Sequence, residues 1–127
     1  MNQNLNLERF EVDLSLPMVD DAVIERLRAL ESPDDEVPFT RQMINGFEGA
    51  VPEMIQNLKN AFESRSERDV IYWSHKLAGF SMNVGGRRFA SLCQRIEVAA
   101  PAAMGVPELT KTLELILADL VVALKKY

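Results

Sequence analysis

The sequence predicts an all-α protein, an antiparallel four-helix bundle with an additional short N-terminal helix. Apolar residues recur every three or four positions along most of the 127 residues, and stretches rich in glycine, proline and charge separate these apolar segments. No segment alternates apolar and polar residues over a useful length, so we expect no sheet. The length suits one domain. We therefore expect an irregular arm at residues 1–17 and a single bundle domain at residues 18–127.

Two helices are expected in the N-terminal half. A short helix at about residues 19–31 begins near Asp20 or Asp21, because aspartate suits a helix start, and it ends before the turn-forming stretch SPDDEVP. A long helix follows at about residues 38–63. Its apolar positions are Phe39, Met43, Phe47, Val51, Met54, Leu58 and Phe62.

The next helix is expected at about residues 66–84. Ser66 can cap its start, with Asp69 three residues further on. Gly85 and Gly86 predict its end, because glycine tolerates the left-handed conformation that terminates many helices.

Two more helices complete the predicted bundle. One runs over about residues 86–100 and ends before Pro101, and it is expected to bury Phe89, Leu92, Cys93 and Ile96. The stretch PAAMGVP is read as a loop, and the last helix follows at about residues 107–125. The buried stripe of the last helix is Leu109, Leu113, Ile116, Leu117, Leu120 and Leu124.

His75 is the only histidine of the chain and lies in the middle of the helix expected at residues 66–84. At about 100° per residue, five apolar side chains fall within an arc of about 80°, and His75 projects about 180° from the centre of that arc. We therefore expect the imidazole to face solvent or a partner. The five residues of this predicted buried stripe are Val70, Trp73, Leu77, Phe80 and Val84.

The residues expected around the imidazole combine open access with apolar surface. Gly79 lies one turn after His75, and a glycine inside a helix costs about 1 kcal/mol relative to alanine, which easier access to the ring would offset. A close helix–helix contact is the alternative explanation for this glycine. Ile71, Tyr72 and Met82 share the same face and suggest a docking surface, unless the N-terminal arm covers them.

Charge is distributed unevenly along the chain. The net charge is −5, which argues against general nucleic-acid binding, yet residues 65–95 hold six basic and two acidic side chains. Arg68 and Arg87 belong to this basic set, and Arg87 is expected to contact the partner. A positive zone around His75 would attract an acidic partner and tolerate a phosphoryl group.

Several classes of protein are excluded by composition. The single Cys93 cannot form an intrachain disulfide, and one cysteine with one histidine is too few for a zinc site. The acidic run Asp34–Glu36 is read as a solvated turn. The start lacks the pattern of a signal peptide, and the apolar stretch LELILADLVVAL is too short to span a bilayer. We expect a cytoplasmic, monomeric protein with no metal of its own.

Over about residues 38–100, and more loosely in the last helix, the chain resembles a histidine-containing phosphotransfer (HPt) domain of two-component phosphorelays. The long helix and the segment that leads into SHKLAGFSMNVGG have the rhythm of that family. The residues that carry the resemblance are His75, Leu77, Gly79, Ser81, Asn83, Gly85, Phe89, Cys93, Ile96 and Glu97.

The resemblance implies a phosphorelay intermediate. His75 would accept a phosphoryl group from the aspartate of one receiver domain and pass it to another, with response regulators and a hybrid sensor kinase as the partners. Gly79 would keep the approach to the ring open. Magnesium and the reacting aspartate would come from the partner, so the chain would need no cofactor and would not itself be an enzyme. It also lacks a nucleotide-binding loop for phosphorylation from ATP.

One position departs from the family pattern. The family usually has a lysine three residues after the histidine, where this chain has Ala78. Lys76 and Arg68 are the candidates for supplying the missing positive charge. The departure keeps a second hypothesis open, a docking module that binds a receiver or kinase without accepting phosphate. A third is an accessory protein that promotes loss of phosphate from the receiver.

Overall fold

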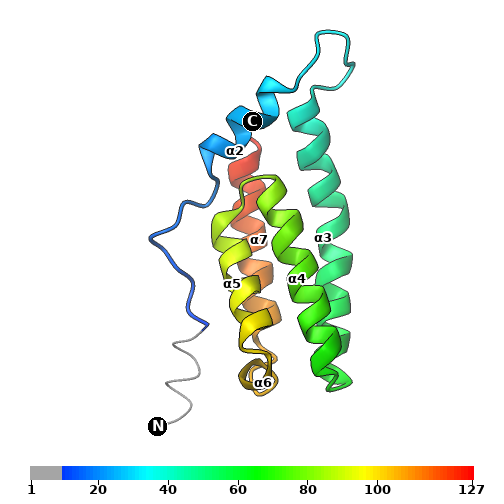
Figure 1. Ribbon diagram of the computed structural model, residues 1–127, viewed down its shortest axis with the longest axis vertical. Helices are drawn as coiled ribbons and strands as arrows, with labels where there is room; N and C mark the ends of the chain where they lie inside the picture. Colours follow the sequence, from blue (N-terminus) through cyan, green and yellow to red (C-terminus); the bar gives the residue numbers. More distant parts are fainter. Residues whose placement is uncertain (1–9) are drawn as a thin grey trace.

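A computed structural model describes residues 10–127 of the chain (Figure 1). These residues form six helices and no strand, which confirms the predicted fold class. The first nine residues of the predicted arm lie outside the described residues. The helices are α2 (Asp21–Ala29), α3 (Phe39–Glu63), α4 (Glu67–Asn83), α5 (Arg87–Val98), α6 (Ala100–Ala103) and α7 (Leu109–Leu124).

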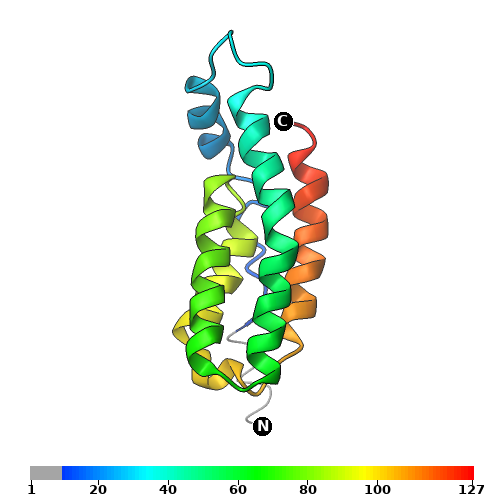
Figure 2. The ribbon, with the colours of Figure 1, turned by 90° about the vertical axis from the view of Figure 1, so that its right-hand side faces the viewer.

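The four longer helices, α3, α4, α5 and α7, lie side by side along the long axis of the molecule (Figures 1 and 2). Helix α2 lies at one end of this bundle and α6 at the other. Each long helix packs its apolar stripe inward, as expected for an up-and-down bundle. Fully buried side chains from all four helices form the core, among them Ile44, Leu58, Leu77, Phe89 and Leu113.

Side chains fix the starts of three helices. Asp20 Oδ1 accepts a hydrogen bond from the backbone N–H of Ala22 at the start of α2. Ser66 Oγ accepts one from the N–H of Asp69 at the start of α4, as the sequence predicts. Helix α3 follows Pro38, which offers no capping side chain. Glu31 instead reaches across the preceding loop, and its carboxylate accepts the N–H of Thr40 at 3.2 Å.

The turn between α4 and α5 depends on glycine. Gly85 has φ of 76°, and a Cβ at this position would lie 2.9 Å from the carbonyl oxygen of Asp20. The N–H of Asp20 in turn donates to the carbonyl of Gly85 at 2.7 Å. A Cβ on Gly86 would lie 2.8 Å from the side chain of Leu120. The two glycines therefore let α2, α7 and the α4–α5 hairpin meet closely.

Two elements differ from expectation. The stretch read as a loop contains α6, because alanine is the best helix former and Pro101 lies in the first turn, where its missing N–H removes no intrahelical bond. The last helix begins at Leu109, since Pro107 and Glu108 form the turn before it.

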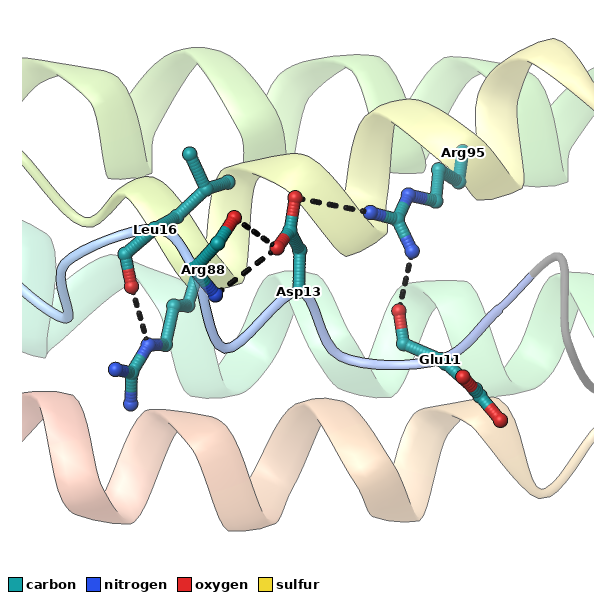
Figure 3. Close-up of polar contacts among 6 residues, drawn as sticks. Glu11, Asp13, Leu16, Arg88 and Arg95 are labelled. Atoms are coloured by element: carbon teal, nitrogen blue, oxygen red, sulfur yellow. Dashed lines mark hydrogen bonds and ion pairs between the residues drawn. The ribbon is translucent and has the colours of Figure 1, made fainter.

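Residues 10–17, the described part of the arm, and residues 18–20, which connect it to α2, run in an irregular path along α5 and the start of α7 (Figures 1 and 3). Phe10 is buried, and Phe10 and Val12 face Val106 and Leu109 across a shallow hollow. The arm therefore covers the side of the bundle formed by α5 and α7.

Arginines of α5 hold the arm in place (Figure 3). Arg88 donates to the carbonyl of Leu16 at 2.6 Å and to that of Leu14 at 3.3 Å. Arg95 donates to the carbonyl of Glu11 and lies 3.6 Å from the carboxylate of Asp13. Hydrogen bonds from Ser15, helped by both arginines, hold the pKa of Asp13 below its ordinary value.

Replacing Arg88 with methionine should release the arm while leaving the bundle folded. Methionine keeps much of the apolar stem but removes the donors to the arm carbonyls. We expect proteases to cleave residues 11–20 faster, and the free energy of unfolding to fall by about 1–2 kcal/mol. Limited proteolysis with mass spectrometry and denaturant unfolding measure the two effects. Arg26→Met, on an exposed position of α2, is the matched control. Equal cleavage in both variants would mean that Arg88 does not hold the arm in place.

Candidate functional site

His75 lies near the middle of α4, and its side chain is 74% exposed. The buried residues of α4 are Val70, Ser74, Leu77, Ala78 and Ser81. The centre of this buried face lies about 120° around the helix from His75. The imidazole therefore points outward, as predicted.

The phase of the α4 prediction is wrong by about 60°. Phe80, placed in the predicted stripe, is 38% exposed, and Trp73 is only half-buried. Ala78, three residues after His75, is only 5% exposed and packs in the core, so it does not share the face of His75. The physical reason is that α5 packs closely on this flank of α4. The small residues Ser74, Ala78 and Ser81 allow that approach. They were not part of the predicted stripe, which includes only large apolar residues.

Glu97 of α5 binds the imidazole. Nδ1 of His75 lies 3.1 Å from Oε1 and 3.0 Å from Oε2 of Glu97. A carboxylate only accepts hydrogen bonds, so Nδ1 carries the proton and donates it to Glu97. In the neutral ring Nε2 then holds a free electron pair. This nitrogen is the more distant one from the helix backbone, and it is the nucleophilic atom of the site.

Glu97 is a site residue that was not predicted from the sequence, although it is one of the residues that carry the family resemblance. A usable signal was present. His75 lies ten residues before Gly85, and Glu97 lies eleven residues after Gly86. In an antiparallel hairpin that turns at these glycines, the two side chains lie at the same height.

Apolar side chains lie near His75 on α4. Ile71, Tyr72 and Met82 are each more than one-third exposed, and the described part of the arm lies on α5 and α7 instead of covering them. Val98 follows Glu97 and is 85% exposed, but it lies on another face of α5, where it lines a hollow with Ser91, Gln94 and Arg95.

Gly79 lies on the exposed surface of α4, one turn after His75. A Cβ built on it would have no atom within 4 Å outside its own helix. Close packing between helices therefore does not account for this glycine.

The predicted cations, Lys76 and Arg68, lie against other partners. The ammonium of Lys76 lies 5.3 Å from the centre of the Tyr72 ring and 5.9 Å from that of Trp73, in a cation–π arrangement. Arg68 is largely solvent-exposed and approaches its neighbour Asp69 at 3.6 Å. Neither residue forms an ion pair with Glu97 in the described chain.

Arg87 is held away from His75. It pairs with Asp20 at 3.1 Å at the start of α5, about 15 Å along that helix from Glu97. Arg88 and Arg95 bind the arm. Three of the six basic residues in the predicted positive zone, Arg87, Arg88 and Arg95, therefore bind the N-terminal segment. Among residues 10–127, no three histidine, cysteine or acidic side chains gather to form a metal site.

No family model matches the sequence, and no curated protein matches it. Among solved structures, the chain is similar to the crystal structure of histidine-containing phosphotransfer protein B (HptB) from Pseudomonas aeruginosa PAO1. The match has a TM-score of 0.74 and covers 87% of this chain and 93% of that one, with 22% sequence identity. The chain therefore has the fold of an HPt protein. Within the described residues, no helix has the length and apolar character to cross a membrane.

Replacing His75 with glutamine should leave the fold and its stability almost unchanged. The ring contributes little packing, and an exposed ion pair stabilises by about 0–1 kcal/mol. Denaturant unfolding followed by circular dichroism should give a free energy within about 1 kcal/mol of the wild-type value. A loss of several kcal/mol would mean that the ring supports the core.

Proposed function

We propose that this protein is a phosphorelay intermediate. It accepts a phosphoryl group on Nε2 of His75 from the aspartyl phosphate of a receiver domain and passes that group to a second receiver domain. The observation that carries the proposal is the exposed imidazole, held by Glu97 with its reactive nitrogen outward, on an HPt fold.

The proposed reaction is an in-line displacement at phosphorus. The electron pair of Nε2 forms the N–P bond as the O–P bond to the aspartate breaks, and the carboxylate leaves with that bonding pair. Such transfers depend on positioning and charge neutralisation more than on covalent help from the protein. The receiver supplies the aspartate and a magnesium ion, and this chain supplies an oriented nucleophile.

The exposed surface fits a receiver partner. Ile71, Tyr72 and Met82 give an apolar contact area on the face of α4 that carries His75. Gly79 leaves room beside the ring. A partner that brings an acidic, metal-loaded site would also bring the cation that Ala78 does not provide. Receivers of response regulators and of a hybrid sensor kinase meet this description, and they imply a cytoplasmic setting.

A second candidate function is docking without phosphate acceptance. The observation that favours it is that Lys76, the basic residue next to His75, rests on aromatic rings, while Ala78 stands where the family usually has a lysine. Such a module would bind a receiver or kinase through the same surface. In that case the imidazole would contribute to binding alone.

The relay is tested by phosphotransfer from receivers of the host. Each receiver is phosphorylated with labelled phosphate and mixed with this protein and magnesium. We expect label on His75 from at least one receiver, in a form that is labile to acid and stable to alkali. His75→Gln should take up no label. Receiver binding without label on the wild-type protein would select the docking function, and faster receiver dephosphorylation without phosphohistidine would select the accessory function.

Gly79→Leu tests access to the ring. The position is open, and leucine forms helix better than glycine by about 0.8 kcal/mol, so the free energy of unfolding should stay equal or rise. The side chain would stand one turn from His75 and obstruct the incoming receiver. We expect the transfer rate to fall at least tenfold, while Gly79→Ala stays within about threefold of wild type. A wild-type transfer rate in Gly79→Leu would mean that Gly79 is not needed for access to the ring.

A further inference from the structure

We propose that the outward face of α7 binds the same face of a second copy of this chain, so that the protein forms a weak dimer with two-fold symmetry. The residues of this surface, named the α7 face, are Lys111, Leu115, Ala118, Asp119 and Val122. The inference does not depend on the proposed function, because the α7 face lies apart from His75. The monomer expected from the sequence is then the form present at low concentration.

The α7 face is exposed although three of its five residues are apolar. Leu115 is 70% exposed and Val122 is 64% exposed, and Ala118 between them is exposed as well. At about 100° per residue, the five side chains fall within an arc of about 100°, centred about 150° from the buried side of the helix. Single exposed apolar residues are normal, but these are neighbours on one stripe, which indicates a contact surface.

The apolar surface continues from the α7 face into a groove between α7 and α3. Leu117 and Val121 of α7 line this groove together with Pro52 and Ile55 of α3, and Ala118 lies at its edge. The apolar area that a second copy can cover is therefore larger than the exposed side chains of α7 alone.

The charges of the α7 face are complementary to themselves. Lys111 lies four residues before Leu115 and Asp119 lies four residues after it, so one row of side chains runs from positive through apolar to negative. Within the part of the chain that the structure describes, neither Lys111 nor Asp119 forms an ion pair. Glu114, three residues after Lys111, pairs instead with Lys59 of α3 at 2.7 Å.

A two-fold axis at Leu115 satisfies both charges. When two copies of α7 cross in opposite directions with these rows alongside each other, Leu115 meets Leu115 of the second copy, and each Lys111 faces an Asp119. The small Ala118 in the adjacent row leaves room for the leucine of the second copy. Two helices paired in the same direction would instead place lysine beside lysine and aspartate beside aspartate. The charges therefore favour the antiparallel pairing.

The proposed dimer leaves the candidate site open. Helices α4 and α7 each pack against α3 and α5, so they lie diagonally across the bundle from each other (Figures 1 and 2). The described part of the arm meets a different flank of α7, at Leu109 and Thr112. Both His75 side chains of the dimer would therefore point away from the contact, where a partner can reach each of them.

Sedimentation equilibrium measures the dimer directly. Wild type, Leu115→Gln and the control Val98→Gln are compared from about 10 µM to about 1 mM, a range in which weak complexes form. Val98 is the matched control because it is an apolar side chain on α5 that is 85% exposed. Circular dichroism checks that each variant is folded, which we expect because both positions are exposed.

We expect wild type to change from monomer to dimer as its concentration rises. A contact made by one helix and the edge of a groove lies at the low end of interface sizes, so the dimer should be weak. Leu115→Gln should raise the Kd by at least about tenfold, because each dimer loses two central leucines. Val98→Gln should keep the Kd within about twofold of wild type, because that side chain lies outside the α7 face.

Charge reversal tests how the two helices pair. Lys111→Glu and Asp119→Lys each place two pairs of like charges across the contact, so each should raise the Kd by at least about fivefold at low salt. The double variant restores opposite charges and should return the Kd to within about twofold of wild type. Arg26→Glu, at an exposed position of α2, changes the net charge as Lys111→Glu does and should not affect the Kd.

Three results would overturn the proposal. Wild type that stays monomeric at every concentration would mean that the α7 face does not bind a second copy. A dimer that Leu115→Gln leaves unchanged would use another surface of the chain. A dimer that Leu115→Gln weakens, but that neither single charge reversal weakens, would contradict the antiparallel pairing of Lys111 with Asp119.

Discussion

The register between α4 and α5 is the constraint on which the candidate site depends. Gly85 turns the chain with a positive φ at a point where a Cβ would collide with the backbone of Asp20, so the hairpin can close in only a narrow range of geometries. That closure places Glu97 opposite His75, because His75 lies ten residues before Gly85 and Glu97 lies eleven residues after Gly86. A shift of one residue in either helix would rotate one partner by about 100° and separate the pair.

The α4–α5 hairpin places its core residues and the residues of the candidate site on different faces. Leu77 and Phe89 face the core and are fully buried, whereas His75 and the edge of Glu97 face outward. Substitutions on the outer face should therefore have little effect on folding, because the apolar area that stabilises the bundle lies on the other side of each helix. The described part of the arm lies on the face formed by α5 and α7, away from the exposed face of α4.

Much of the fold could be predicted from the sequence, because it depends on local signals. Ser66 and Gly85 mark the ends of α4, and the spacing of apolar residues gives the four long helices. The orientation of His75 followed from the same periodicity. The exact phase of α4 did not, since Ala78 and Ser74 are buried by the approach of α5, and a small residue gives no hydrophobic signal of its own. The roles of Arg88 and Arg95 in holding the arm also depend on contacts more than seventy residues apart in the chain, which periodicity cannot reveal.

The buried Ala78 and the acceptor Glu97 bear on one electrostatic question, namely what neutralises a phosphoryl group on His75. A lysine at position 78 would have to extend out of the α4–α5 interface to reach the phosphoryl oxygens, and that interface is filled by small side chains. In the proposed relay, the positive charge near a phosphoryl group on His75 therefore comes from the metal-loaded receiver. The replacement of lysine by alanine is compatible with that proposal, because position 78 faces the interface and not the open side of the ring.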